Sequence, residues 1–60
     1  MTEQLVEKML EMLRSAKVDA SKFDEGNGAA GTRVRKSCLE VAKMAKMLRH
    51  QVQDVKNSRN

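Results

Sequence analysis

The feature that most constrains this chain is an apolar repeat in its second half. The repeating residues are spaced alternately four and three positions apart: Val34, Cys38, Val41, Ala45, Leu48, Val52 and Val55. Such spacing predicts one long helix, over about residues 28–57, that packs against another helix as in a coiled coil. Leu39, Ala42, Met44 and Met47 flank this seam, so the apolar band is wide enough for a helix bundle.

A shorter amphipathic segment precedes this repeat, over about residues 2–25. Its apolar residues also follow helical spacing: Leu5, Met9, Met12, Leu13, Ala16, Ala20 and Phe23, with Val6 and Leu10 widening the stripe. Thr2 is a candidate N-cap, and Glu3 suits the first turn because it faces the positive end of the helix dipole. No part of the sequence alternates like a strand.

A small-residue joint, GNGAAG, separates the two segments. Gly26 is free to adopt the left-handed conformation that often ends a helix. Asn27 is the expected N-cap of the second helix, with Thr32 as an alternative start. With a turn at residues 26–27, the two helices can only fold back on each other. The sequence therefore predicts an all-α fold, an antiparallel hairpin of a short and a long helix.

Chain length makes self-association part of the prediction. Sixty residues allow a single domain, residues 1–60, which buries too little surface to be robust alone. Cys38 is the sole cysteine and His50 the sole histidine, so neither an internal disulfide nor a clustered metal site is expected. We expect a homo-oligomer, most simply a two-fold dimer forming a four-helix bundle. Met9, Met12, Met44 and Met47 would fill gaps in its core.

Charge is divided unevenly between the two segments. Residues 1–25 carry four Lys/Arg against six Asp/Glu, a net charge of −2, whereas residues 26–60 carry eight against two, a net charge of +6. A surplus of positive charge in the second segment favours an acidic partner. Arg33, Arg35 and Lys36 follow Thr32 at the start of the long helix and, since Val34 faces the seam, are expected to point away from it.

Further basic residues repeat at outward positions along the long helix: Lys43, Lys46, Arg49 and Lys56. The candidate contacts to the phosphates of duplex DNA are Thr32, Arg33, Arg35, Lys36, Lys43, Lys46 and Arg49. A solvated outer face is the ordinary alternative. No aromatic residue lies among them and no base-reading group is apparent, so binding is expected to be independent of sequence.

The run EGNGAAGTRVRKSCLEVAKMAKMLRHQVQDVKN resembles the bacterial linker-histone-like proteins first associated with the chlamydial nucleoid. The shared pattern is Gly26-Asn27, Ala29-Ala30, Arg33-Val34-Arg35 and a helix rich in Leu, Ala and Lys. This resemblance implies a DNA-binding protein of the nucleoid that compacts the chromosome. The chlamydial members carry a Lys/Ala/Pro-rich tail that these 60 residues do not include, so the DNA contacts are expected on the hairpin and its oligomer.

Enzymatic function is not expected, because a base, a nucleophile and a pocket do not come together. Cys38 lies on the seam and is expected to be buried, and His50 is expected to be solvated. Asp24-Glu25 suits a helix end better than a metal loop. We therefore expect no cofactor, no metal and no small-molecule substrate.

Two other functional classes stay open. One is a helical module that binds another protein and has no role with nucleic acid. The other is a basic amphipathic element on an anionic membrane surface, against which the absence of Trp and the single Phe23 argue. With no signal peptide and no apolar run long enough to span a bilayer, we expect a cytoplasmic, nucleoid-associated protein without a membrane partner.

Overall fold

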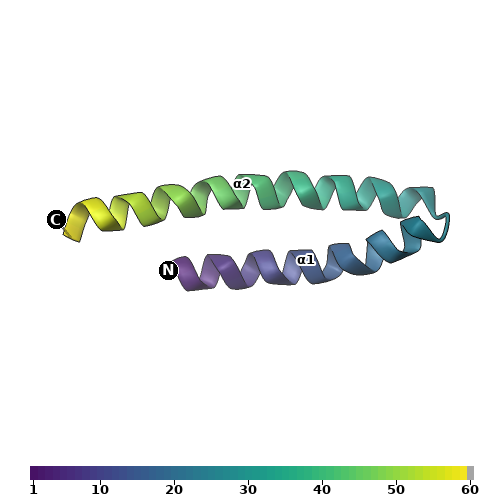
Figure 1. Cartoon of the computed structure of the whole chain (residues 1–60), viewed down its shortest axis with the longest axis horizontal. Coiled ribbons are helices and arrows are strands. Elements are labelled where there is room, and N and C mark those ends of the chain that lie inside the picture. The colour runs from purple at the N-terminus through teal and green to yellow at the C-terminus, as the bar shows by residue number, and fades with distance from the viewer. Residues whose placement is uncertain (60) are drawn as a thin grey trace.

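The chain folds as an antiparallel hairpin of two helices. A computed structural model describes residues 1–59, with α1 at Thr2–Asp24 and α2 at Gly28–Arg59. The molecule measures 52 × 15 × 11 Å, and α2 extends past the start of α1 (Figure 1). These bounds confirm the all-α hairpin. The long helix, expected to end at about residue 57, continues to Arg59, and Lys56 and Arg59 lie at the negative end of its dipole.

The turn ends one helix and begins the next with backbone hydrogen bonds and one side chain. Gly26 has φ of 106°, and its N–H donates to the Phe23 carbonyl at 2.9 Å. The N–H of Asn27 donates to the Lys22 carbonyl at 3.0 Å, which completes a Schellman motif. Asn27 Oδ1 then accepts the N–H of Ala30 at 3.2 Å. Both turn predictions are confirmed, Gly26 in the left-handed region and Asn27 as the cap of α2.

The first helix begins without a side-chain cap. Thr2 is already helical and Met1 occupies the N-cap position, where it makes no side-chain hydrogen bond. The prediction that Thr2 caps α1 is therefore wrong, because Thr2 is the first residue of the helix and the N-cap lies one residue earlier, at Met1. The N–H of Leu5 donates to the Met1 carbonyl at 3.4 Å, and Glu3 occupies the first turn.

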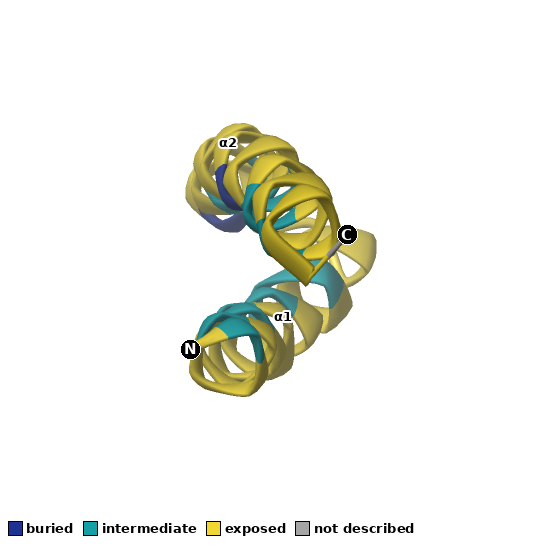
Figure 2. Cartoon of the chain, turned by 90° about the vertical axis from the view of Figure 1, so that its left-hand side faces the viewer, coloured by how far each residue is buried: buried dark blue, intermediate teal, exposed yellow. Residues whose placement is uncertain are grey.

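The helices meet along one row of side chains on each, which we call the inner rows. Their residues are buried or half-buried: Leu5, Met9, Met12, Ala16 and Asp19 on α1, and Ala30, Val34, Ser37, Val41, Met44, Leu48, Gln51 and Val55 on α2. Among residues 1–59 only Ala30 and Met44, at 0% and 9% exposure, are buried (Figure 2). The hairpin alone therefore has a very thin core.

The residues of α2 that face α1 are not all those of the predicted seam. Val34, Val41, Ala45, Leu48 and Val55 are half-buried, but Cys38 and Val52 are exposed within the single chain. Burial of Cys38 is thus wrong for the hairpin itself. The inner row of α2 also contains polar residues that the predicted seam lacked, Ser37 and Gln51, and Gln51 Oε1 is buried with no hydrogen-bond partner in the described chain.

Three further apolar residues lie elsewhere than predicted. Met44 is in the core rather than beside it, whereas Leu39 and Met47 are exposed. Met47 therefore fills no gap in the hairpin. These differences arise because α2 is rotated about its axis relative to the orientation that the predicted seam implies. An apolar band this wide offers more than one row of residues that can pack against α1.

The side chain of Phe23 approaches α2 closely near the turn, which explains why residue 31 is a glycine. A Cβ at this position would lie 2.5 Å from Phe23 Cδ1 and 2.6 Å from Phe23 Cε1. The ring of Phe23 therefore lies directly over the glycine, and next to it Ala30 is fully buried. Gly31 thus provides space for an aromatic ring, because any larger residue would meet the Phe23 side chain.

The hairpin exposes more surface than its mass predicts for a compact monomer. Its accessible area is 4993 Å², whereas a compact protein of 6.8 kDa would expose about 4,000 Å². Large apolar side chains contribute to the excess, including Leu10, Leu13 and Phe23. Neither described helix combines the length and apolar character needed to cross a membrane.

Candidate nucleic-acid interface

The side of α2 that faces away from α1 carries basic residues and no acidic ones. At about 100° per residue, the positions farthest from the inner row share this side, which we call the outer face. Its residues are all exposed: Thr32, Arg35, Lys36, Leu39, Ala42, Lys43, Lys46, Arg49, His50, Gln53, Lys56 and Asn57. No carboxylate interrupts it, because the two acidic residues of α2, Glu40 and Asp54, are at positions beside the inner row. The outer face is thus a continuous cationic surface.

The predicted DNA contacts divide into two groups in the structure. Six of them, Thr32, Arg35, Lys36, Lys43, Lys46 and Arg49, are brought together on the outer face. The seventh, Arg33, lies beside the inner row instead. None of the six forms an ion pair within residues 1–59, where the one salt bridge joins Arg33 to Asp19.

Arg33 does not point freely away from α1 as expected. Its Nε donates to Asp19 Oδ1 at 3.0 Å, with the arginine side chain 49% exposed and the aspartate 15% exposed. The pair joins the two helices near the turn. Because the position after the turn lies so close to α1, a long side chain at residue 33 reaches the opposite helix, and Arg33 acts first as a structural contact.

The corresponding side of α1 carries the opposite charge. Its exposed residues away from α2 include Glu3, Glu7, Glu11, Asp24 and Glu25, against the basic residues Arg14 and Lys17. The hairpin therefore separates charge across its width, with an acidic face on α1 and a basic face on α2. An anionic polymer would be attracted to one side of the molecule and repelled by the other.

One exposed side chain on the outer face was not predicted from the sequence. Leu39 is 64% exposed, more than any other large apolar residue after Met1. Arg35, Lys36, Lys43 and Lys46 stand three, four or seven positions from it, so it lies among cations on the same helix face. Its spacing from Arg35 and Lys46 was visible in the sequence, but Leu39 was interpreted as part of the apolar band that flanks the seam.

A second surface lies between the two helices along one edge of the hairpin. Beside the inner row of each helix, a second set of positions recurs every seven residues and holds only apolar or small residues. These are Val6, Leu13 and Ala20 on α1, and Gly31, Cys38, Ala45 and Val52 on α2. In an antiparallel pair of helices these positions fall on the same edge, which we call the apolar flank. The opposite edge is mostly polar, with Lys8, Ser15 and Lys22 on α1 and Arg33, Glu40 and Asp54 on α2, although the exposed Met47 also lies on it.

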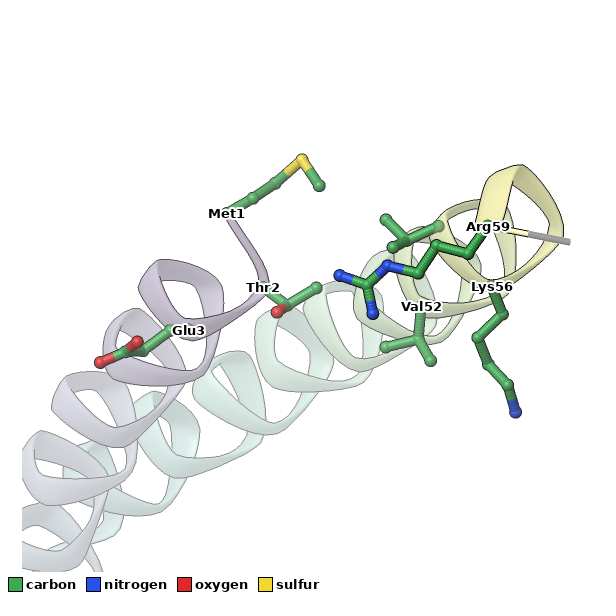
Figure 3. A pocket seen from close by; sticks show the side chains of 7 residues that line it. Met1, Thr2, Glu3, Val52, Lys56 and Arg59 are labelled. Carbon is green, nitrogen blue, oxygen red and sulfur yellow. The ribbon is translucent and has the colours of Figure 1, made fainter.

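The overhang of α2 forms a shallow cavity with the start of α1. About 420 Å³ in volume, it is lined by Met1, Thr2, Glu3, Val52, Val55, Lys56 and Arg59. The side chain of Arg59 extends back toward the start of α1 (Figure 3). The lining mixes apolar, acidic and basic groups and holds no cysteine or histidine. Within residues 1–59 no three His, Cys, Asp or Glu side chains are grouped to hold a metal ion.

Comparison with known proteins gives one match. A family model described as "Histone H1-like protein Hc1" matches residues 3–58, nearly the whole hairpin. No curated protein and no solved structure matches the chain significantly.

Proposed function

We propose, for a chain that belongs to the histone H1-like Hc1 family, that the outer face of α2 binds the phosphates of duplex DNA. Members of this family are non-enzymatic DNA-binding proteins of the nucleoid. The observation that carries the proposal is the set of six exposed Lys and Arg side chains on the outer face of α2, with no carboxylate among them. Phosphate contacts made by Arg and Lys give affinity without sequence preference.

The residues that we propose to contact DNA are Thr32, Arg35, Lys36, Lys43, Lys46 and Arg49. The pair with Asp19 leaves Arg33 as a secondary contact at most, although part of its side chain is exposed. The same reasoning adds Lys56, which shares the outer face and is exposed. The acidic face of α1 supports this orientation, because it would repel the polyanion from the other side.

A titration against a mixed-sequence duplex at several salt concentrations tests the proposal. Double substitution Arg35→Ala/Lys36→Ala should reduce the slope of log K against log salt by about 1.8, at about 0.9 for each phosphate that is no longer neutralised. The matched control is Lys8→Ala/Lys22→Ala, which removes the same charge from the polar edge. An equal weakening in the two variants, or no binding by the folded wild type at low salt, would leave the chain as a helical protein-binding module.

Self-association through the apolar flank is the second part of the proposal. The surface excess of about 1,000 Å² over a compact monomer is close to the ~800 Å² that each partner buries in a stable dimer. A second hairpin placed on the flank would cover Cys38 and Val52, the two predicted seam residues that the single chain exposes. In this dimer the predicted seam makes two contacts. The seam residues on the inner row pack against α1, and those on the apolar flank pack against the second copy.

Charge selects between two ways of pairing two flanks by two-fold symmetry. One places α2 against the second copy's α2, and both carry a surplus of positive charge. The other places each α2 against the second copy's α1, which is acidic on its outer side. Because like charges repel, we infer the second arrangement. It directs the two basic outer faces to opposite sides, so one dimer is able to bridge two duplexes.

Light scattering or sedimentation measures this assembly directly. Leu13→Glu places a charge on the apolar flank and should convert the dimer to a monomer, with thermal stability that no longer rises with concentration. Val18→Glu is the control, since Val18 is as exposed but lies away from the flank. A wild type that is monomeric at high micromolar concentration would exclude the dimer.

A further inference from the structure

We propose that α2 lies within the major groove of duplex DNA, rather than across the outside of a single phosphate strand. This inference rests on the proposed function and specifies its geometry. The deciding observation is that five of the six Lys and Arg side chains on the outer face lie in two rows on either side of a central ridge, and the sixth, Lys46, lies on the ridge itself. The ridge runs Thr32, Leu39, Lys46 and Gln53; Arg35, Arg49 and Lys56 lie on one side, and Lys36 and Lys43 on the other.

Two rows of cations match two strands of phosphates. The major groove is about 12 Å wide and admits an α-helix, whose diameter with side chains is about 10–12 Å. A helix inserted there has one phosphate strand on each side, so both rows find partners at once. A helix lying across one strand would place one row near phosphates and leave the other in solvent.

The exposed leucine fits the same arrangement. Leu39 is 64% exposed and lies on the ridge between the two rows, at the position that would face the groove floor. The groove floor displays the methyl groups of thymine, which apolar side chains contact. On the outside of the duplex the same leucine would face charged phosphate. Because α1 packs against the opposite side of α2, it does not obstruct insertion.

Comparison of DNA and RNA duplexes of equal length and sequence separates the two geometries. The major groove of A-form RNA is deep and too narrow for side chains to read, although its phosphate density is similar. We expect the wild type to bind the DNA duplex at least about tenfold more tightly than the RNA duplex at the same salt concentration. Equal binding to both would overturn the groove geometry and leave the proposed function intact; binding to neither would overturn both.

Leu39 gives an independent measurement on DNA alone. Replacing thymine by uracil throughout the DNA duplex removes the groove methyls and keeps every phosphate. Wild-type affinity should fall about fourfold, the value of one buried methyl group, and the Leu39→Gln variant should show no fall. Val18→Gln, an equally exposed apolar position on α1, should respond to uracil as the wild type does. Equal affinities of the wild type for both duplexes would contradict contact between Leu39 and the groove floor.

Separate removal of the two rows completes the test. Arg35→Ala/Arg49→Ala and Lys36→Ala/Lys43→Ala each remove two cations from one side of the ridge. Both should reduce the salt slope by a similar amount, about 1.8. If one variant alone changes the slope, the helix follows a single strand and the groove geometry is wrong. Helical content measured by circular dichroism confirms that each variant is folded before titration.

Discussion

The packing of Phe23 over Gly31 makes a quantitative prediction about stability. Glycine inside a helix costs about 1 kcal/mol relative to alanine, so Gly31→Ala would ordinarily stabilise α2 by that amount. Here the new Cβ would lie 2.5 Å from the Phe23 ring, which must move away. Phe23 is about half exposed, so moving its ring into solvent costs about 1 kcal/mol, half of the value of a fully buried side chain.

These two effects nearly cancel in the wild type but not in a chain without the aromatic ring. Gly31→Ala should leave the free energy of unfolding of the wild type nearly unchanged. In a Phe23→Ala background, where nothing opposes the new methyl, the same substitution should stabilise by about 1 kcal/mol. The double-mutant cycle should therefore report a coupling of about 1 kcal/mol between the two positions.

Urea unfolding followed by circular dichroism supplies the four free energies of the cycle. All four proteins must be compared at the same concentration, and again at a tenfold higher one, because the proposed association would add to the apparent stability. If Gly31→Ala stabilises both backgrounds equally, Phe23 does not lie over Gly31, and the close approach of the helices at the turn is not as described.

The remaining predictions concern the turn and the ion pair. Gly26→Ala should lower the free energy of unfolding by about 1–2 kcal/mol, because the left-handed conformation is costly for a residue with a Cβ; Gly28→Ala, with ordinary φ and open space around it, should not lower it. Asn27→Ala should cost about 0.5–2 kcal/mol because it removes the cap, and Asn27→Asp should retain most of the stability, as thermal unfolding would show. Asp19→Asn should cost less than about 1 kcal/mol because Arg33 is half exposed, and a larger destabilisation at high salt would contradict a screened surface pair.

Local signals explain why the hairpin was predictable. The Gly26-Asn27 pair specifies a helix end and a helix start within two residues, through backbone conformation and one side chain. The 3.6-residue period on either side specifies two helices, and the short connection leaves only an antiparallel arrangement. None of these inferences needs to know which residues touch across the pair.

The side of α2 that packs against α1 was not predictable from these local signals. Its apolar band covers both the inner row and the apolar flank, so either Cys38 or Ser37 is able to face α1. Contacts between helices decide the matter: Phe23 lies over Gly31, and Arg33 reaches Asp19. The same ambiguity affected Leu39, which was predicted to flank the seam but lies on the outer face among the basic residues.

Asn27 serves both helix ends, and this has a consequence for how the molecule folds. Its N–H completes the end of α1 while its side chain opens α2, so hairpin closure needs only residues adjacent in sequence. Contacts this local carry little loop-closure entropy and form in microseconds to milliseconds. In the dimer that we propose, the hairpin would therefore close before two chains meet, and the encounter of preformed hairpins would be the concentration-dependent step.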